Sequence, residues 1–408
     1  MLGNSEVVNP GKPEITAEEA EEFLAHVAQT FQSKPFNAHR VFSGGHAQTL
    51  AGYAWPRRLR LRPYLDQERL FQVAPDTKVL ANCRWQANPT EHPTIVIWHG
   101  MEGSSAAVYM LATARKAYRA GFNVVRMNLR NCGATEHLTP TLYHGGLSED
   151  PRAVVTELIE RDGLPKIFLA GFSLGGNLVL KLAGEYGESP PNEILGVCAV
   201  SPSVDLNASA NLINHRSNRL YQRDFLRRLR KRIYIKKKLF PGLYDTAGIK
   251  LIRTIREFDD RFTAVAHGFA NVADYYHRAS ALRVTDRIRV PTLIIHAHDD
   301  PFIPFAPLRH PSIAANPYIL LLETERGGHV AFLAAKPSRF HRARNNFAKS
   351  SKVPTAGISE ATSEVSGYDS RFTIDDSPTE DRFWAENRVV EFCWLADARL
   401  TNCKSELR

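Results

Sequence analysis

The sequence predicts an α/β fold with a mostly parallel central sheet, helices on both faces of the sheet and a helical lid inserted above it. From about residue 68 onward, short apolar runs alternate with helical patterns, which is typical of a parallel sheet covered on both faces. Residues 171–175 read G-x-S-x-G and join one such run to a helical pattern. About ninety residues separate the run ending at Val200 from the run beginning at Thr292. One connecting helix needs far fewer, so this stretch is expected to form the lid.

Eight apolar runs are predicted to be strands, in a chain of 408 residues that is long enough for one large domain or two medium ones. A helix over roughly residues 17–31 is expected to precede them, and another should begin behind Ser173 because apolar residues recur there at three- and four-residue spacing. The strands are expected at Leu70–Val73, Val79–Cys83, Thr94–Trp98, Asn123–Met127, Ile167–Ala170, Gly196–Val200, Thr292–His296 and Tyr318–Leu322.

The apolar and polar stretches also predict how the chain is divided. Residues 343–380 are rich in Ser, Thr, Gly and Asp, which favours a flexible surface loop. The next segment has the spacing of an amphipathic helix that closes the domain. The predicted parts are an N-terminal extension (1–35), a main domain (36–342) with the lid at about 203–288, the loop (343–380), the closing helix (381–398) and a tail (399–408).

Composition and cysteine usage indicate a soluble globular protein. Hydrophobic residues make up 43% and charged residues 23% of the chain, as in ordinary globular domains. The five cysteines are scattered and form no C-x-x-C pair, which disfavours a zinc site or a disulfide framework. The N-terminal residues have neither the basic nor the apolar region of a signal peptide. These features predict a cytoplasmic location.

The net charge of +9 comes largely from one stretch, Arg216 to Lys238, which holds eleven Lys or Arg and a single acid, Asp224. Such a run is usually a solvated helix face, and its aromatic residues would also let an amphipathic helix dock on its own protein. Peripheral contact with an anionic membrane is the alternative. No nucleic-acid-binding motif is present, so a nucleic-acid partner is not expected.

Ser173 is the candidate nucleophile, because the pattern around it lets a serine sit on a tight strand-to-helix turn with its hydroxyl exposed. The turn needs glycines, since the backbone there is tight and a substrate must come close. Taken alone, G-x-S-x-G also occurs in glycine-rich turns without any chemistry. A nucleophilic serine needs a base, an acid that orients the base, and donors for an oxyanion.

The remainder of the chain supplies these groups in the expected order of serine, acid and histidine. His329 follows two glycines just after the last predicted strand, where a base can approach the serine. After the preceding strand, Asp300 lies four residues before Pro304, the spacing that favours it as the acid over its rival Asp299. Metal ligation by His296, His298 and Asp299 is disfavoured because no further ligand cluster completes a site.

Two backbone N–H groups are the candidate oxyanion hole. One belongs to Leu174, which directly follows the candidate nucleophile, and the other to Met101 in the loop 98–104 after the third strand. That loop contains an H-G-x-x-G pattern, in which His99 is expected to be structural and not a second base. No cofactor and no metal are predicted to be needed.

With these motifs in place, the chain resembles the YheT-like (AB-hydrolase 4) family of α/β-hydrolases over residues 36–342 and 381–398. The resemblance implies an α/β-hydrolase fold, carboxylic ester hydrolase activity and a triad of Ser173, Asp300 and His329. The loop at 345–378 departs from the shorter family pattern. The motifs that carry the resemblance are His46–Leu50, His99–Gly103, Arg130–Gly133, Tyr143–Gly146, Gly171–Asn177, Arg256–Asp260, the lid segment Phe258–Tyr276, Pro291–Pro301 and Gly327–Val330.

The predicted function is hydrolysis of carboxylic esters through an acyl-enzyme intermediate. The substrates expected are short- to medium-chain acyl esters or acylglycerol and other lipid esters. A thioesterase or an acyltransferase using the same triad is the alternative, although the acyltransferase pattern H-x-x-x-x-D is absent. A hypothesis of another class is a membrane- or lipid-binding protein that uses the basic lid segment.

Overall fold

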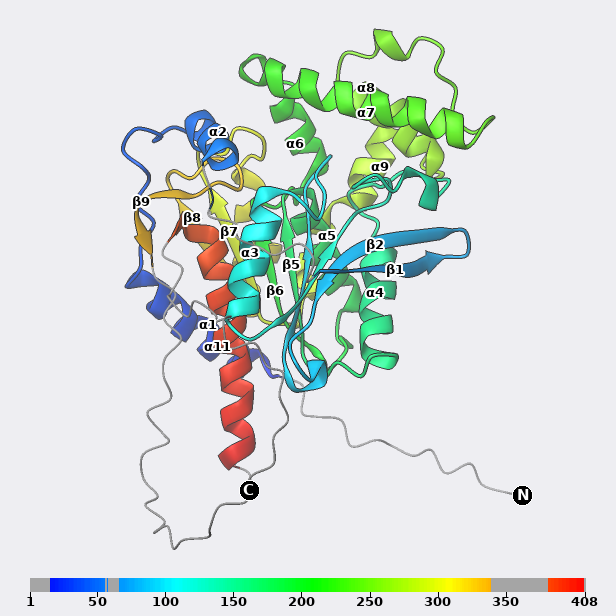
Figure 1. Ribbon diagram of the computed structural model, residues 1–408. Coiled ribbons are helices and arrows are strands. Elements are labelled where there is room, and N and C mark those ends of the chain that lie inside the picture. The colour runs from blue at the N-terminus through cyan, green and yellow to red at the C-terminus, as the bar shows by residue number, and fades with distance from the viewer. Residues whose placement is uncertain (1–14, 56, 58–65, 339–380, 407–408) are drawn as a thin grey trace, which may run out of the picture.

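A computed structural model of the protein describes residues 15–55, 57, 66–338 and 381–406. Its centre is an eight-stranded sheet in the order β1-β2-β4-β3-β5-β6-β7-β8 (Figure 1). β2 pairs antiparallel with β1 and β4, whereas the other neighbouring strands are parallel, which confirms the predicted sheet. The strands are β1 (Gln67–Ala74), β2 (Thr77–Arg84), β3 (Thr94–Trp98), β4 (Asn123–Met127), β5 (Ile167–Phe172), β6 (Ile194–Val200), β7 (Thr292–Ala297) and β8 (Ile319–Thr324), and each contains residues of a predicted run.

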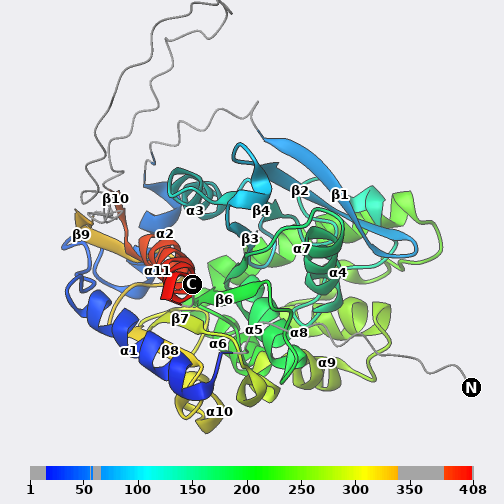
Figure 2. The same ribbon diagram turned by 90° about the horizontal axis from the view of Figure 1, so that it is seen from below.

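Helices cover both faces of this sheet (Figure 2). Along β3, Ile95 and Ile97 pack with one layer of helices, while Val96 and Trp98 pack with the other, because successive residues of a strand point to opposite faces. The five strands β3 to β7 are buried along their whole length, so their sequences are continuous apolar runs. One layer contains α1 (Ala17–Gln32), α3 (Val108–Arg119) and α11 (Trp384–Glu406), and the other contains α4 (Glu149–Glu160) and α5 (Leu174–Tyr186).

The first and last described helices, α1 and α11, form part of this core. α1 begins with a capping box between Thr16 and Glu19, and its Phe23 packs on Phe392 of α11 with ring centroids 5.8 Å apart. The predicted helix over roughly residues 17–31 is present as α1 and lies in a helical layer on the sheet. Its apolar face is buried because α11 and the sheet cover it.

The C-terminal segment differs from the prediction in three ways. Residues 381–383 form strand β10 (Asp381–Phe383), which pairs antiparallel with a second unpredicted strand, β9 (Leu333–Ser338). α11 is not amphipathic in its first turns, since residues 383–393 are all buried between α1, α3 and the sheet. The helix also continues through most of the predicted tail, to Glu406. The predicted loop at 343–380 lies outside the described residues.

The lid is the segment that connects β6 to β7 along the chain. It lies above the carboxyl ends of the strands, in the upper part of Figure 1. It contains α6 (Leu206–Ile213), α7 (Arg219–Leu239), α8 (Ile255–Phe258), the π-helix η6 (Asp259–Ala264) and α9 (Val272–Ala279). The main domain also contains α2 (Gly45–Ala54) and α10 (Pro311–Ala314). Within the described ranges, no helix combines the length and the apolar character required to cross a bilayer.

Candidate active site

Ser173 stands at a sharp turn between β5 and α5. Its φ of 56° and ψ of −117° lie in a region that residues other than glycine rarely adopt. The turn closes only because Gly171 and Gly175 have no side chains: a Cβ on Gly171 would collide with the Gly175 backbone, and a Cβ on Gly175 would lie 2.5 Å from the Trp98 carbonyl oxygen. The strained turn raises the Ser173 hydroxyl above the end of the sheet, as the G-x-S-x-G pattern predicts.

His329 lies in the loop after β8, and its Nε2 is 2.9 Å from the Ser173 Oγ. Two neighbouring contacts fix this loop. The His329 N–H donates to the Thr49 Oγ1 of α2 at 2.9 Å, and the Val330 N–H donates to the Ser201 Oγ at 3.1 Å. Val330 is β-branched yet has a φ of 63°, a strained conformation that the loop must hold in place.

The structure brings Asp300, and not Asp299, to this histidine. The Asp300 Oδ2 is 2.8 Å from His329 Nδ1, and its Oδ1 accepts hydrogen bonds from the N–H groups of Phe302 and Ile303. Burial alone would raise the pKa of Asp300, but His329 and these donors outweigh it and lower the pKa. The Asp299 Oδ1 instead accepts from the Gly328 N–H at 2.8 Å, so this side chain holds the histidine loop.

These contacts assign the histidine tautomer. An ionised Asp300 can only accept, so the Nδ1 of His329 carries the proton that points to it. The Nε2 is then the acceptor for the Ser173 hydroxyl. Serine, histidine and aspartate thus form one hydrogen-bonded chain, the arrangement that activates a serine hydroxyl.

Among the described residues, the backbone N–H groups of Met101 and Leu174 have no hydrogen-bond partner. The backbone N–H groups on either side of Met101 have hydrogen-bond partners. The Gly100 N–H donates to the Tyr109 hydroxyl at 3.0 Å, and the Glu102 N–H donates to the Tyr143 hydroxyl at 3.1 Å. The two donors that the sequence predicts for an oxyanion are thus unpaired, and their role stays a prediction.

His99 stabilises the same loop from below. Its Nδ1–H donates to the Gly100 carbonyl at 2.7 Å, while its Nε2 accepts from the Leu129 N–H at 3.1 Å. Burial lowers the pKa of His99 to about 4, so the ring is neutral at pH 7. Both ring nitrogens are occupied by backbone groups, which agrees with a structural residue and not with a second base.

The lid reaches into this loop through a buried ion pair. The Arg232 guanidinium of α7 donates from Nε to the Glu102 Oε1 at 3.1 Å and from Nη2 to the Oε2 at 2.9 Å. The Tyr143 hydroxyl also donates to Glu102, at 2.8 Å. Glu102 follows Met101 and has a φ of 56°, so these contacts hold the backbone that aims the Met101 N–H.

A largely apolar cavity lies between Ser173 and the lid. Its walls include both candidate oxyanion residues and many apolar side chains of the lid, among them Leu206, Ile213, Leu229, Ile255 and Phe258. The lid therefore encloses the space in which a group bound to Ser173 would lie.

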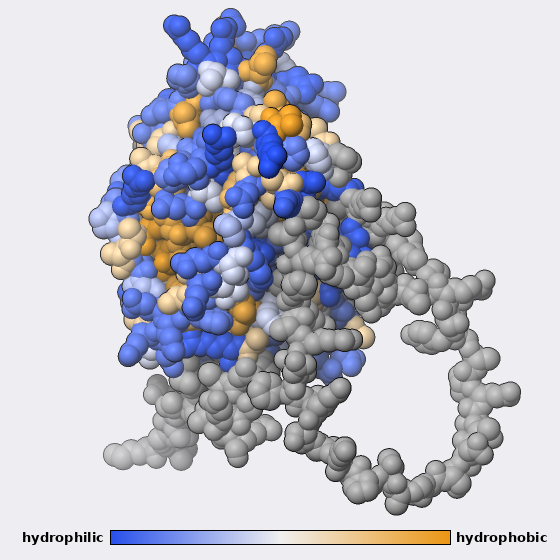
Figure 3. Space-filling model, turned by 90° about the vertical axis from the view of Figure 1, so that its left-hand side faces the viewer, coloured by the Kyte–Doolittle hydropathy of each residue, from blue (hydrophilic) through white to orange (hydrophobic). Residues whose placement is uncertain are grey.

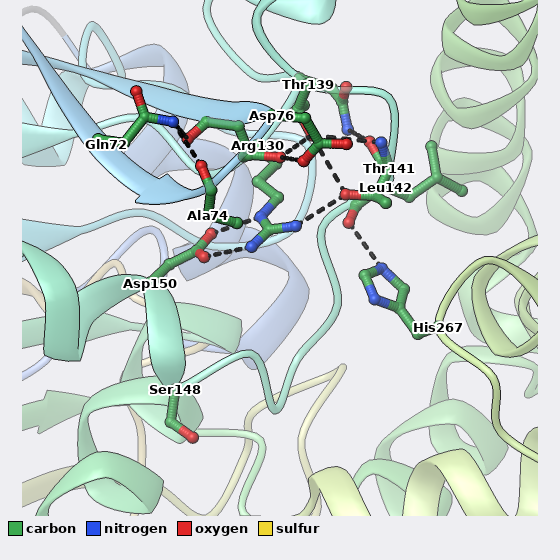
Figure 4. Close-up of polar contacts among 12 residues, drawn as sticks. Gln72, Ala74, Asp76, Arg130, Thr139, Thr141, Leu142, Ser148, Asp150 and His267 are labelled. Carbon is green, nitrogen blue, oxygen red and sulfur yellow. Dashed lines mark hydrogen bonds and ion pairs between the residues drawn. The ribbon is translucent and has the colours of Figure 1, made fainter.

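One wall of the cavity is held by polar contacts within the main domain and by one contact with the lid (Figure 4). Arg130 donates to Asp150 at 2.7 Å and to the Thr141 Oγ1 at 2.7 Å, and thus holds the segment that precedes Leu142. The His267 Nε2–H, from the lid, donates to the Leu142 carbonyl at 2.7 Å. Because Leu142 lines the cavity, these bonds help to fix the distance between lid and main domain.

The histidines near Asp300 are occupied by other contacts. The Nε2 of His296 is 3.1 Å from the Ile303 carbonyl, and the Nε2 of His298 is 3.0 Å from Glu323. In the described ranges, no group of three or more His, Cys, Asp and Glu side chains is placed to hold a metal ion.

Two residues that support His329 were not assigned from the sequence, Thr49 and Ser201. Thr49 belongs to the motif His46–Leu50, which marks the family resemblance, but the motif alone does not say what it contacts. Its partner lies 280 positions away in the chain, and only the fold brings them together.

Comparison with known proteins identifies the family. A family model described as alpha/beta hydrolase fold matches residues 93–335, which is more than half of the chain. The chain belongs to the α/β-hydrolase fold family. The YheT protein of Escherichia coli (strain K12) is 33% identical over 78% of this chain and 91% of its own length, which confirms the predicted resemblance.

Two yeast relatives in this family have names that state an activity. A Saccharomyces cerevisiae monoacylglycerol lipase is 34% identical over 60% of this chain and 56% of its own length. A medium-chain fatty acid ethyl ester synthase/esterase 2 of the same yeast is 28% identical over 68% of this chain and 63% of its own length. The chain thus spans less than two thirds of either yeast protein.

Proposed function

We propose that this protein hydrolyses carboxylic esters, with Ser173 as nucleophile, His329 as general base and Asp300 as the residue that orients the base. The observation that carries the proposal is the hydrogen-bonded chain from the Ser173 Oγ to Asp300, which opens into an apolar cavity. Membership of the α/β-hydrolase fold family and the ester-cleaving activities named for the yeast relatives support the enzyme class.

In the first step, His329 removes the proton of Ser173 while the Oγ attacks the ester carbonyl. Asp300 stabilises the imidazolium that forms, and the Met101 and Leu174 N–H groups stabilise the oxyanion. Each such donor is worth roughly 2.7–4 kcal/mol in the transition state. His329 then passes the proton to the departing alcohol, and an acyl-Ser173 ester remains. In the second step it activates water, which releases the acid and restores the serine.

The substrates proposed are short- to medium-chain acyl esters or acylglycerol and other lipid esters. The apolar wall that the lid presents suits an acyl chain, because burying its methylenes removes apolar surface from water. A thioesterase or an acyltransferase with the same triad is the alternative. The word synthase in the name of one yeast relative keeps acyl transfer to an alcohol open.

The test is the Ser173→Ala variant, assayed on p-nitrophenyl esters from acetate to octanoate. Removing the nucleophile should lower kcat at least 1,000-fold, since the residual rate depends on binding and the oxyanion donors alone. Ser189→Ala, at an exposed serine, is the matched control. A Ser173→Ala variant that hydrolyses the esters as fast as the parent would refute the proposal. Acyl-CoA substrates, and assays with added ethanol, separate the thioesterase and acyltransferase alternatives from ester hydrolysis.

A second proposal concerns the outer face of α7, which we propose docks on an anionic bilayer. Arg223, Arg227 and Lys231 follow each other at four-residue spacing on this exposed face. The apolar side chains of Leu220 and Tyr234 are on α7 as well, 81% and 39% exposed. Basic groups that flank exposed apolar groups on one helix fit the headgroup region of an anionic membrane.

The space-filling view agrees with such a surface. In Figure 3 the top of the molecule, over the lid, is mostly hydrophilic with isolated hydrophobic residues. Sedimentation with vesicles of phosphatidylcholine, with or without phosphatidylserine, tests the proposal. Binding should require the anionic lipid, weaken as salt rises, and fall in a variant with Arg223→Glu and Lys231→Glu. Equal binding to both vesicle types would exclude it.

A further inference from the structure

The cavity above Ser173 contains polar side chains that the proposed reaction does not use. Asp259 lines the cavity from the π-helix η6, and Ser203 lines it from the loop after β6. Burying a carboxylate or a hydroxyl inside an apolar cavity costs free energy unless it has hydrogen-bond partners. Their presence there needs an explanation beyond acyl-chain binding.

The Asp259 carboxylate can accept more hydrogen bonds than it receives within the protein. Its Oδ1 accepts from the Thr263 Oγ1 at 2.7 Å, and its Oδ2 accepts from the Tyr276 hydroxyl at 2.8 Å. An ionised carboxylate can accept about four hydrogen bonds, so about two positions are left over. Among the described residues, no Lys, Arg or His forms an ion pair with Asp259. The nearby Arg256 donates instead to Asn207 and Asn211.

The hydroxyl group of Ser203 also has room for a further hydrogen bond. Its side chain is only 4% exposed, and its Oγ has no hydrogen-bond partner in the part of the chain that the structure describes. The backbone N–H of Ser203 points at the Ser173 carbonyl, 3.4 Å away, so this residue is next to the candidate nucleophile. A buried hydroxyl without a partner is uncommon in native proteins, and a bound ligand would satisfy it.

The backbone that presents Asp259 is itself unusual. Residues 259–264 form a π-helix, a rare conformation that occurs frequently at functional sites. In this conformation both Asp259 and Thr263 line the cavity. The wider turn therefore places Asp259 and Thr263 in the wall of the cavity that Ser173 also lines.

From these contacts we infer that the cavity binds an ester that carries a free hydroxyl group, with Asp259 as the acceptor of the hydrogen bond from that hydroxyl. Ser203 provides a further polar contact nearer to the reacting carbonyl. The inference rests on the proposed ester hydrolysis and adds the substrate class to it. The hydroxyl belongs either to the alcohol part or to the acyl part of the ester.

A hydroxyl fits this wall better than a cationic group does. Arg256 is close enough to act on the charge of Asp259. It would repel an ammonium group, whereas a neutral hydroxyl needs only a free acceptor. Sites built to bind a substrate hydroxyl strongly reject analogues that lack it, because the buried partner then stays unpaired.

The experiment compares matched esters by their kcat/KM values. 1-Butyrylglycerol is paired with propyl butyrate, and ethyl 3-hydroxybutyrate with ethyl butyrate, so the pairs place the hydroxyl in the alcohol and the acyl part respectively. The parent enzyme should prefer the hydroxylated ester at least tenfold in one pair. Asp259→Leu should lower that ratio at least tenfold. Asp260→Leu, at the exposed neighbouring position, is the matched control and should keep the ratio.

A second variant covers the case in which Asp259→Leu does not fold. Asp259→Asn keeps the size of the side chain but has a single acceptor oxygen, for which Thr263 and Tyr276 would compete with the substrate. It should lower the ratio at least threefold. A merely structural Asp259 would lower both kcat/KM values of a pair equally and leave the ratio unchanged.

Three results would overturn the inference. These are equal rates within both pairs, a ratio that Asp259 variants do not change, and a preference for butyrylcholine over every neutral ester. In each of them the enzyme still cleaves esters, so the proposed function stands. Failure of the parent enzyme to cleave any of the esters would overturn the proposed function together with the inference.

Discussion

Replacing Arg232 by Met should destabilise the protein strongly, because it leaves Glu102 as a buried carboxylate without its cation. The two side chains are only 10% and 3% exposed and share two hydrogen bonds, of 2.9 and 3.1 Å. Removing one partner of such a buried pair costs about 3–5 kcal/mol, since the remaining charge is neither solvated nor paired. We expect a loss of this size in the free energy of unfolding, measured by urea denaturation at pH 7.

The surface of the same helix offers a matched control. Arg228 forms an ion pair with Asp224 at 2.7 Å, but these side chains are 48% and 39% exposed. Exposed pairs contribute about 0–1 kcal/mol, so Arg228→Met should cost less than about 1 kcal/mol. Both variants remove one positive charge. The difference between their losses of unfolding free energy therefore measures the effect of burying the ion pair.

The double variant Arg232→Met with Glu102→Gln tests the cause. When both charges are removed, no unpaired carboxylate is left, so the double variant should be more stable than Arg232→Met alone. If the two single losses simply add, the ion pair is not the reason for the destabilisation, and the argument fails.

The same substitution should also affect catalysis through the Met101 N–H. Glu102 follows Met101 and is held by Arg232 and Tyr143. With the loop released, kcat on p-nitrophenyl butyrate should fall at least tenfold at a temperature where the variant is folded, with a smaller change in KM. An unchanged kcat in the folded variant would show that the lid does not position this donor.

Further outcomes follow from the triad, the cavity and the turn. Asp300→Asn should lower kcat about 10⁴-fold, because His329 would lose its correct tautomer; a loss below tenfold would contradict the assigned role. Burial raises the pKa of Asp259 to about 6, above its unfolded value of about 3.9, so its contribution to stability is present below pH 4 and is lost as the pH rises through 6. Relative to Asp259→Asn, the parent should therefore lose up to about 3 kcal/mol of unfolding free energy between pH 4 and pH 7 in urea denaturation, and a constant difference would contradict this. Gly175→Ala should lower the free energy of unfolding by about 3 kcal/mol or more, because its Cβ would lie 2.5 Å from the Trp98 carbonyl oxygen; calorimetry of the variant checks this.

The sheet could be predicted from the sequence because local patterns report burial. β3 to β7 are buried on both faces, so they read as continuous apolar runs between helical patterns. β9 and β10 were missed because they pair across a long stretch of chain, and β10 has only three residues. α11 was misjudged for a related reason. Its sequence contains Glu386, Arg388 and Glu391, which suggest an exposed face, but these charges are buried and Arg388 pairs with Glu391.

For the basic stretch in the lid, too, the sequence did not show which charges are buried. Charge alone cannot tell a membrane-facing residue from a structural one. In the structure Arg232 is turned inward to Glu102, and Lys236 donates to the Glu136 carbonyl at 3.1 Å, while Arg223 and Lys231 remain on the exposed face. Helical spacing separates the two faces only once the side that packs on the main domain is known.

By itself, the sequence determined the strand order along the chain, the strained turn at Ser173 and the candidate partners that end neighbouring strands. These follow from local backbone preferences and from the rule that parallel strands end at one edge of the sheet. Only the tertiary structure decided between Asp299 and Asp300, placed Thr49 behind His329, and placed Asp259 in the wall of the cavity. The physical reason is that such contacts join residues far apart in the chain or depend on which way a side chain points, and no local pattern encodes either.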